Sequence, residues 1–143
     1  TSKALQSVNI PNSVTHIGRN PFCYCHQLRL TSDNPLFIVI NGLLISSDGT
    51  LISCLSKDTH INIPNSVTHI GDDAFSGCSS LQSINIPNSV THIGDDTLFS
   101  GALFINDAFD GCYALRTIHI PKGSMAKFMQ LLPEELHNKL VEI

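Results

Sequence analysis

Cysteine and histidine are the residues of this chain whose spacing could support metal chemistry. Cys23, Cys25 and His26 form a C-x-C-H cluster of sulfur and imidazole ligands that zinc accepts. A structural zinc site needs four ligands, and this cluster supplies fewer. Cys25 also occupies the same place in a recurring segment as Cys78 and Cys112, where cysteine acts as a small buried hydrophobic residue. We therefore favour packing over zinc binding and expect no metal site and no cofactor.

Cys23 and Cys54 fall outside that recurring position. They could be exposed thiols or could pair with each other, and spacing alone leaves both alternatives open. The total of five cysteines is odd, which excludes a complete disulfide framework.

His16, His69 and His92 share a second recurring position. If the segments stack regularly, the last two imidazoles should lie within about 5 Å of each other, the spacing of neighbouring strands. Two stacked imidazoles could hold a metal ion, but two histidines rarely complete a coordination shell. We favour a solvated position on the outside of a strand.

Paired carboxylates also recur, as Asp72-Asp73 and Asp95-Asp96. Like charges in adjacent turns could form a weak calcium site or could be solvated loop residues, and we favour the second interpretation. The sequence contains no G-x-S-x-G, P-loop, G-x-G-x-x-G or H-E-x-x-H motif. We therefore do not expect an enzyme.

The composition of the chain argues against two classes of partner, nucleic acids and the membrane interior. Eight Lys and Arg residues against 12 Asp and Glu give a net charge of −4, without any basic cluster, which argues against nucleic-acid binding. The longest apolar run, residues 36–40, is far shorter than the roughly 20 residues that a membrane span requires. Hydrophobic residues make up 42% of the chain, which is enough for a folded domain.

The positions discussed above recur because the chain is repetitive. The nonamer I-P-N-S-V-T-H-I-G occurs three times unchanged, at residues 10–18, 63–71 and 86–94. The last two copies are 23 residues apart, a period typical of leucine-rich repeats. The sequence therefore predicts a β-rich solenoid in which coils stack at about 4.8 Å and equivalent residues form columns.

Two insertions interrupt the period. The shorter is expected at about residues 97–107 and the longer at about residues 31–58. The longer one contains apolar runs at 37–40, 43–45 and 51–54, separated by Asn41-Gly42 and Asp48-Gly49, which favour tight hairpin turns. It predicts a small β-meander that projects from the solenoid.

Each unit carries an L-x-x-I-x-I strand pattern. In the clearest copy, Ile84 and Ile86 should point inward, whereas Ser83 and Asn85 should point outward. Val90 and Ile93 should return to the core, and Phe75 and Cys78 should fill the third side of the coil. The outward positions predict a polar ligand-binding face formed by Ser7, Asn9, His60, Asn62, Ser83, Asn85, Thr117 and His119.

The two ends differ. Met125, Phe128, Met129 and Leu132 have helical spacing after Ser124, and Leu136 and Leu140 continue the pattern beyond Pro133. We expect residues 1–121 to form the solenoid and residues 122–143 a helical cap over its last coil. Because residue 1 falls in mid-repeat, we also expect further repeats on the N-terminal side.

The units at residues 5–25, 63–86 and 86–120 resemble the BspA-type leucine-rich repeat, whose pattern is close to L-x-x-I-x-I-P-x-S-V-x-x-I-G-x-x-A-F-x-x-C-x-x-L. The resemblance covers nearly all of residues 5–121 and implies a right-handed coil. Arg19-Asn20-Pro21, Asp58 and the insertion at Thr97 depart from the pattern. Proteins of this family are typically secreted or on the bacterial cell surface, and some bind fibronectin or fibrinogen or mediate coaggregation.

Two functions follow from the resemblance and the repeats. The first is a non-catalytic extracellular or cell-surface recognition module that binds a host or neighbouring-cell protein or a glycan, including extracellular-matrix proteins. The alternative is a structural spacer that belongs to a longer array and has no ligand of its own. A metal-binding module is a weaker third interpretation, and the oligomeric state is left open.

Overall fold

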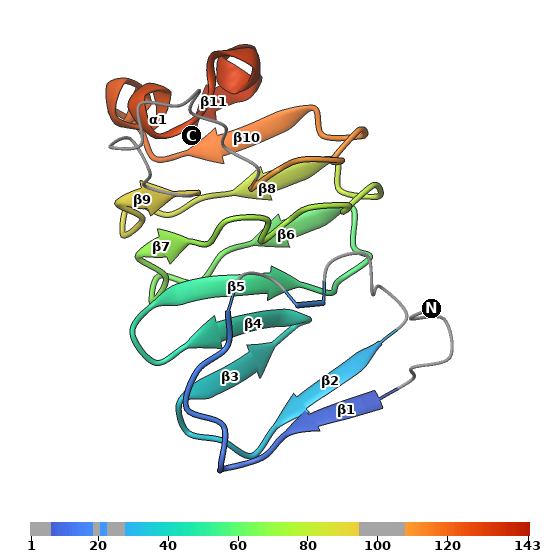
Figure 1. Ribbon diagram of the computed structural model, residues 1–143. Coiled ribbons are helices and arrows are strands. Elements are labelled where there is room, and N and C mark those ends of the chain that lie inside the picture. The colour runs from blue at the N-terminus through green and yellow to red at the C-terminus, as the bar shows by residue number, and fades with distance from the viewer. Residues whose placement is uncertain (1–6, 19–20, 23–27, 95–107) are drawn as a thin grey trace, which may run out of the picture.

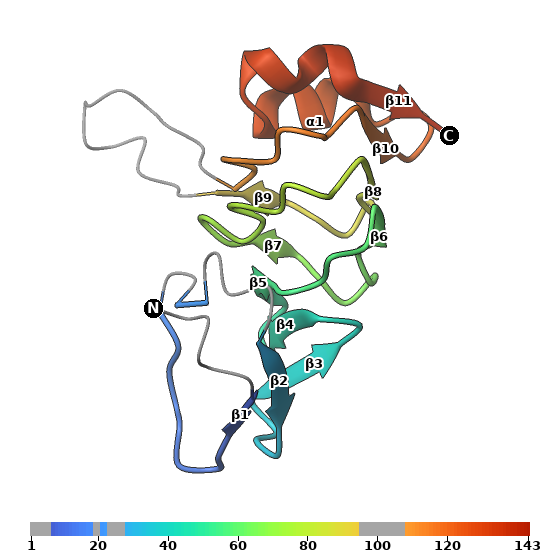
Figure 2. The same cartoon turned by 90° about the vertical axis from the view of Figure 1, so that its right-hand side faces the viewer.

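Parallel β-pairing organises most of the chain, which the computed structural model describes at residues 7–18, 21–22, 28–94 and 108–143. The described strands form three sheets and stack along one axis, with the first and second sheets side by side over the same coils (Figure 1). The C-terminal helical elements lie at one end and the strands β1 and β2 at the other, as the side view of Figure 2 shows. This arrangement confirms the predicted leucine-rich-repeat solenoid.

The first sheet has four parallel strands in the order β11-β10-β8-β6. Its strands are β6 (His60–Asn62), β8 (Ser83–Asn85), β10 (Thr117–Ile120) and β11 (Leu140–Glu142). Register places Ile61, Ile84 and Ile118 in one row, and the last two have no exposed surface. The alternation predicted from L-x-x-I-x-I is therefore confirmed.

The second sheet has the order β3-β4-β5-β7-β9. Its strands are β3 (Phe37–Ile40), β4 (Leu43–Ser46), β5 (Thr50–Cys54), β7 (His69–Ile70) and β9 (His92–Ile93). The predicted meander forms, and Asn41, Gly42 and Gly49 have the positive φ angles expected of its turns. Its expected projection from the solenoid is wrong, because β5 pairs in parallel with β7 and makes the meander part of the stack.

The third sheet contains only β1 (Ser7–Ile10) and β2 (Arg29–Ser32), paired in parallel. This unit has its own apolar cluster, which includes Ile10, Leu28 and Leu30 and is shared with the meander through Phe37 and Leu55. The insertion thus divides the interior into a small N-terminal core and a larger one.

The larger core consists of columns of equivalent residues. Val90 and Phe75 have no exposed surface, and Ile93 is 5% exposed, as the repeat predicts. Cys78 is buried and Cys112 is half-buried, which confirms the predicted packing position for both. Cys54 is also a buried free thiol, so its interpretation as an exposed thiol is wrong.

The Cys54 side chain enters the core because the short meander brings β5 into the solenoid. The Cys78 Sγ contacts the Cys54 carbonyl oxygen at 3.8 Å, which places the two residues in neighbouring coils. Cys23, Cys25, His26, Asp95-Asp96 and the insertion at 97–107 lie outside the described residues, so the predictions for them stay predictions.

The C-terminal segment caps the last coil. It contains α1 (Met125–Leu131), a 3-10 helix (Glu134–Lys139) and β11. Phe128 and Leu132 are buried as the helical spacing predicts, whereas Met129 is 42% exposed. The prediction that Leu140 continues a helix is wrong: it begins a strand that pairs with β10 and extends the first sheet. Within the described residues, no helix is both long and apolar enough to cross a membrane.

Candidate ligand-binding face

The predicted site residues fall into two groups. Six of the eight lie together on the first sheet, and we call them the polar strand face: His60, Asn62, Ser83, Asn85, Thr117 and His119. The other two, Ser7 and Asn9, lie on β1, which belongs to a separate sheet. The eight predicted residues are therefore divided between two sheets, because the meander interrupts the stack between β2 and β6 (Figure 1).

Strand register arranges the polar strand face into two rows. His60, Ser83 and Thr117 are aligned in the first row, and Asn62, Asn85 and His119 are aligned in the second. Each row crosses three strands because the parallel strands pair without a shift. Repetition of sequence thus becomes repetition of polar groups along the solenoid axis.

Hydrogen bonds between strands fix several of these side chains. His60 Nδ1 and Ser83 Oγ are 2.5 Å apart, and Asn85 Nδ2 donates to Asn62 Oδ1 at 2.6 Å. The His60 and His119 rings meet edge to face, with centroids 6.4 Å apart. These contacts reduce the rotamer freedom that a ligand would otherwise have to restrict on binding.

The second row has unused hydrogen-bonding capacity. Asn85 Oδ1 and His119 Nδ1 are both shielded from solvent and have no hydrogen-bond partner. Register pairs Asn85 with His119 across β8 and β10. Because a buried polar atom without a partner costs free energy, a ligand that reorients either side chain and supplies a partner gains that free energy.

Asn9 has a different environment. Its side chain donates to Asp33 Oδ2 at 3.0 Å and accepts from Thr31 Oγ1 at 2.9 Å. The amide is thereby engaged on the β1–β2 sheet and is not aligned with Asn62 and Asn85. We do not group it with the polar strand face.

A second repeated pair lies on β7 and β9. His69 and His92 stack with ring centroids 4.4 Å apart and planes 2° apart, which confirms the predicted proximity. The hydroxyl of the preceding threonine is 2.9 Å from Nδ1 in each case, Thr68 for His69 and Thr91 for His92. Parallel rings direct their lone pairs side by side, so the two imidazoles do not converge on a single metal ion.

The rest of the described chain gives no support for metal binding either. There, no three His, Cys, Asp or Glu side chains come together in an arrangement that could hold an ion. His16 lies on the segment after β1, outside the β7–β9 pair. It was predicted to occupy an equivalent repeat position, but the meander separates its coil from the others.

Stacked parallel strands with a repeated polar outer face define a leucine-rich-repeat solenoid, a class that commonly binds macromolecules through an extended face. The pattern of the BspA type leucine rich repeat region matches residues 1–42 and 48–130, in six copies. The chain belongs to this family. Comparison with curated proteins gives no match.

Solved structures show the same fold. A leucine rich cell surface protein from Faecalibacterium prausnitzii is 30% identical with a TM-score of 0.58, over 82% of this chain and 42% of that one. A leucine-rich repeat protein from Eubacterium ventriosum is 23% identical with a TM-score of 0.56, over 84% of this chain and 37% of that one. The pneumococcal vaccine antigen PcpA is 22% identical with a TM-score of 0.65, over 80% of this chain and 27% of that one. The chain thus spans less than half the length of each.

Proposed function

We propose that this chain is a non-catalytic recognition module of a bacterial cell-surface or secreted protein. The polar strand face binds a protein or a glycan, with the row Asn62, Asn85 and His119 supplying most of the hydrogen bonds. The observation that carries this proposal is the alignment of six polar side chains over three unshifted parallel strands.

Two further findings support the proposal. The chain belongs to a leucine-rich-repeat family, and the relative from Faecalibacterium prausnitzii is a cell surface protein. Solenoids present one continuous face to a partner, and here that face is rich in amide, imidazole and hydroxyl groups. Such groups donate and accept hydrogen bonds with peptide backbones and sugar hydroxyls alike.

The experiment measures binding of the purified chain to immobilised fibronectin and fibrinogen by surface plasmon resonance, with chelator present throughout. The face variant is Asn62→Lys/Asn85→Lys. Its matched control is Asn65→Lys/Asn138→Lys, which makes the same change at two exposed positions away from the face. A third variant, Asn9→Lys, tests the separate β1–β2 sheet.

Saturable binding that weakens at least about tenfold in the face variant and is unchanged in the control supports the proposal. Equal loss in both double variants, or loss in Asn9→Lys alone, contradicts the assignment to the polar strand face. A folded chain that binds neither probe favours the spacer function over matrix adhesion.

A further inference from the structure

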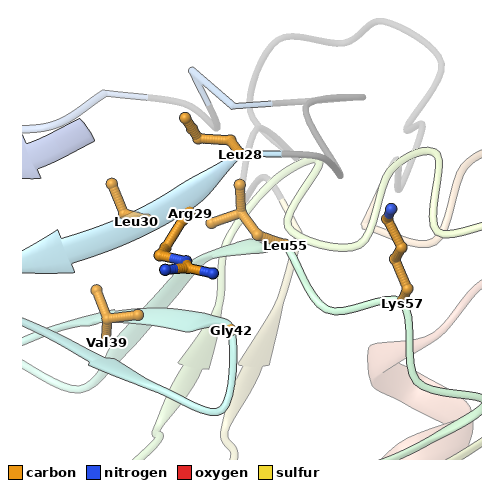
Figure 3. A pocket seen from close by; sticks show the side chains of 7 residues that line it. All are labelled: Leu28, Arg29, Leu30, Val39, Gly42, Leu55 and Lys57. Carbon is orange, nitrogen blue, oxygen red and sulfur yellow. The ribbon is translucent and has the colours of Figure 1, made fainter. Parts of the chain in front are cut away.

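A pocket of about 490 Å³ opens where the small N-terminal core meets the meander (Figure 3). Its lining comes from three places in the chain: β2 and the residue before it, the β3–β4 hairpin, and the segment after β5. The residues are Leu28, Arg29, Leu30, Val39, Gly42, Leu55 and Lys57. None of them belongs to the polar strand face, so the pocket is a second, separate site.

The two charged residues of the pocket are both cations. Arg29 and Lys57 have exposed side chains, and in the described part of the chain neither forms an ion pair or a side-chain hydrogen bond. In the view of Figure 3, Leu55 lies between them. The chain as a whole carries a charge of −4, whereas the pocket lining contains two cations and no anion. They favour a negatively charged ligand.

The other side chains of the pocket are aliphatic. Leu28, Leu30 and Leu55 are 6–7% exposed and belong to the small N-terminal core, so they form a fixed apolar floor. Val39 is half-buried beside them. No side chain of the lining carries a hydroxyl, amide or carboxylate group. A sugar would find few partners for its hydroxyls here, whereas an aliphatic side chain would be well accommodated.

We propose that this pocket binds an acidic peptide segment. An aliphatic side chain of the peptide contacts Leu28, Leu30 and Leu55, while carboxylates of its neighbouring residues lie against Arg29 and Lys57. The planar guanidinium can form two parallel hydrogen bonds with a carboxylate, and the ammonium adds a flexible second charge. This ligand is chosen by the chemistry of the pocket and is independent of the ligand of the polar strand face.

The test uses the full chain and a dye-labelled peptide of alternating leucine and aspartate, followed by fluorescence anisotropy. A peptide with asparagine in place of aspartate is the ligand control. The pocket variant is Arg29→Gln/Lys57→Gln. Its matched control, Arg116→Gln/Lys122→Gln, removes the same charge at two exposed positions outside the pocket.

We expect the pocket variant to weaken binding of the acidic peptide at least about tenfold, and the control variant to weaken it less than about twofold. The asparagine peptide should bind the unchanged chain as weakly as the acidic peptide binds the pocket variant. Methyl NMR shifts of Leu28, Leu30, Val39 and Leu55 should respond to the acidic peptide and not to the asparagine peptide.

Three results would overturn the proposal: no saturable binding by the unchanged chain, equal loss in both double variants, or methyl shifts confined to other residues. An acidic oligosaccharide that displaces the peptide and binds more tightly would show that the pocket selects a glycan instead. The uncharged face variant Asn62→Ala/Asn85→Ala should leave peptide binding unchanged, which separates this test from that of the proposed function.

Discussion

Phe75 and Phe109 stack face to face in neighbouring coils, with ring centroids 5.2 Å apart and planes 3° apart. Phe75 has no exposed surface, and its backbone N–H donates to the carbonyl oxygen of Ala108 at 2.8 Å. The pair therefore joins two coils by both side-chain and backbone contacts.

We expect Phe75→Ala to lower the free energy of unfolding by about 3–5 kcal/mol, because the substitution leaves a cavity between coils that cannot fully collapse. Urea denaturation followed by circular dichroism measures the change. Tyr113→Ala is the control, since Tyr113 is 92% exposed and its removal should have little effect. Similar losses of unfolding free energy in both variants would contradict the conclusion that Phe75 stabilises the core.

Gly49 is expected to be more sensitive to substitution than another glycine of similar conformation. Its φ is +93°, and an added Cβ would lie 2.7 Å from Thr68 Oγ1 and 3.1 Å from the Ser66 carbonyl oxygen. Gly123 has a φ of +86° but open space around it. Gly49→Ala should therefore cost at least about 1 kcal/mol more than Gly123→Ala, and equal costs would show that φ alone sets the effect. Thermal unfolding of the two variants makes the comparison.

The thiol of Cys78 should resist modification in the folded chain. Hydrogen bonding with the Cys112 and Cys54 thiols, together with burial, raises the pKa of Cys78 well above its ordinary value of 9.0. The reactive thiolate is thus scarce in the folded state. Iodoacetamide at pH 8, followed by peptide mass spectrometry, should label Cys78 in urea and leave it largely unlabelled in buffer. Rapid labelling in buffer would contradict the buried position.

The same shift has a consequence for alkaline stability. Because the pKa of Cys78 is raised by folding, its thiol ionises first in the unfolded chain. Its contribution to stability is complete below pH 9 and is lost as the pH rises above that value. Cys78→Ala should reduce the fall in melting temperature between pH 8 and pH 10, although it lowers stability at both.

Asp48 should make the β4–β5 turn sensitive to acid. Its carboxylate accepts hydrogen bonds from the Ser46 hydroxyl and, at 3.2 Å, from the Thr50 N–H. The Ser46 hydrogen bond holds the pKa of Asp48 below its ordinary value of 3.8. The stabilisation is therefore present above pH 3.8 and is lost as the pH falls through the lower pKa of the folded state. Asp48→Asn should show a smaller drop in melting temperature between pH 5 and pH 3, and an unchanged drop would contradict this account.

The repeat made the fold predictable. Identical nonamers require identical local structure, so the inward isoleucines, the buried Phe75 and the proximity of His69 and His92 all followed from the period. The strands β7 and β9 of the second sheet could not be predicted in the same way, because they contain two residues each. A pattern of alternating polarity is not recognisable over two residues.

Other differences between the predictions and the structure arise where insertions interrupt the 23-residue period. Asn9 occupies the same repeat position as Asn62 and Asn85 but lies on another sheet. The meander is inserted between the β1–β2 unit and the later coils, and its strand β5, not β2, pairs with the next coil through β7. Cys54 lies in the core for the same reason. The Arg29 and Lys57 pocket gave no signal in the sequence, since its lining residues are brought together only by the meander.

The separation of the β1–β2 sheet from the rest of the stack has a mechanical consequence. Among the described residues, no backbone ladder joins this sheet to the other two. The junction consists of side chains of the small N-terminal core and a few hydrogen bonds, such as that from Ser32 Oγ to the Phe37 carbonyl oxygen. A pulling force along the solenoid axis would be resisted at this junction mainly by apolar contacts. Elsewhere it would be resisted by rows of hydrogen bonds between strands. We expect the N-terminal unit to detach first under tension, while the polar strand face keeps its shape.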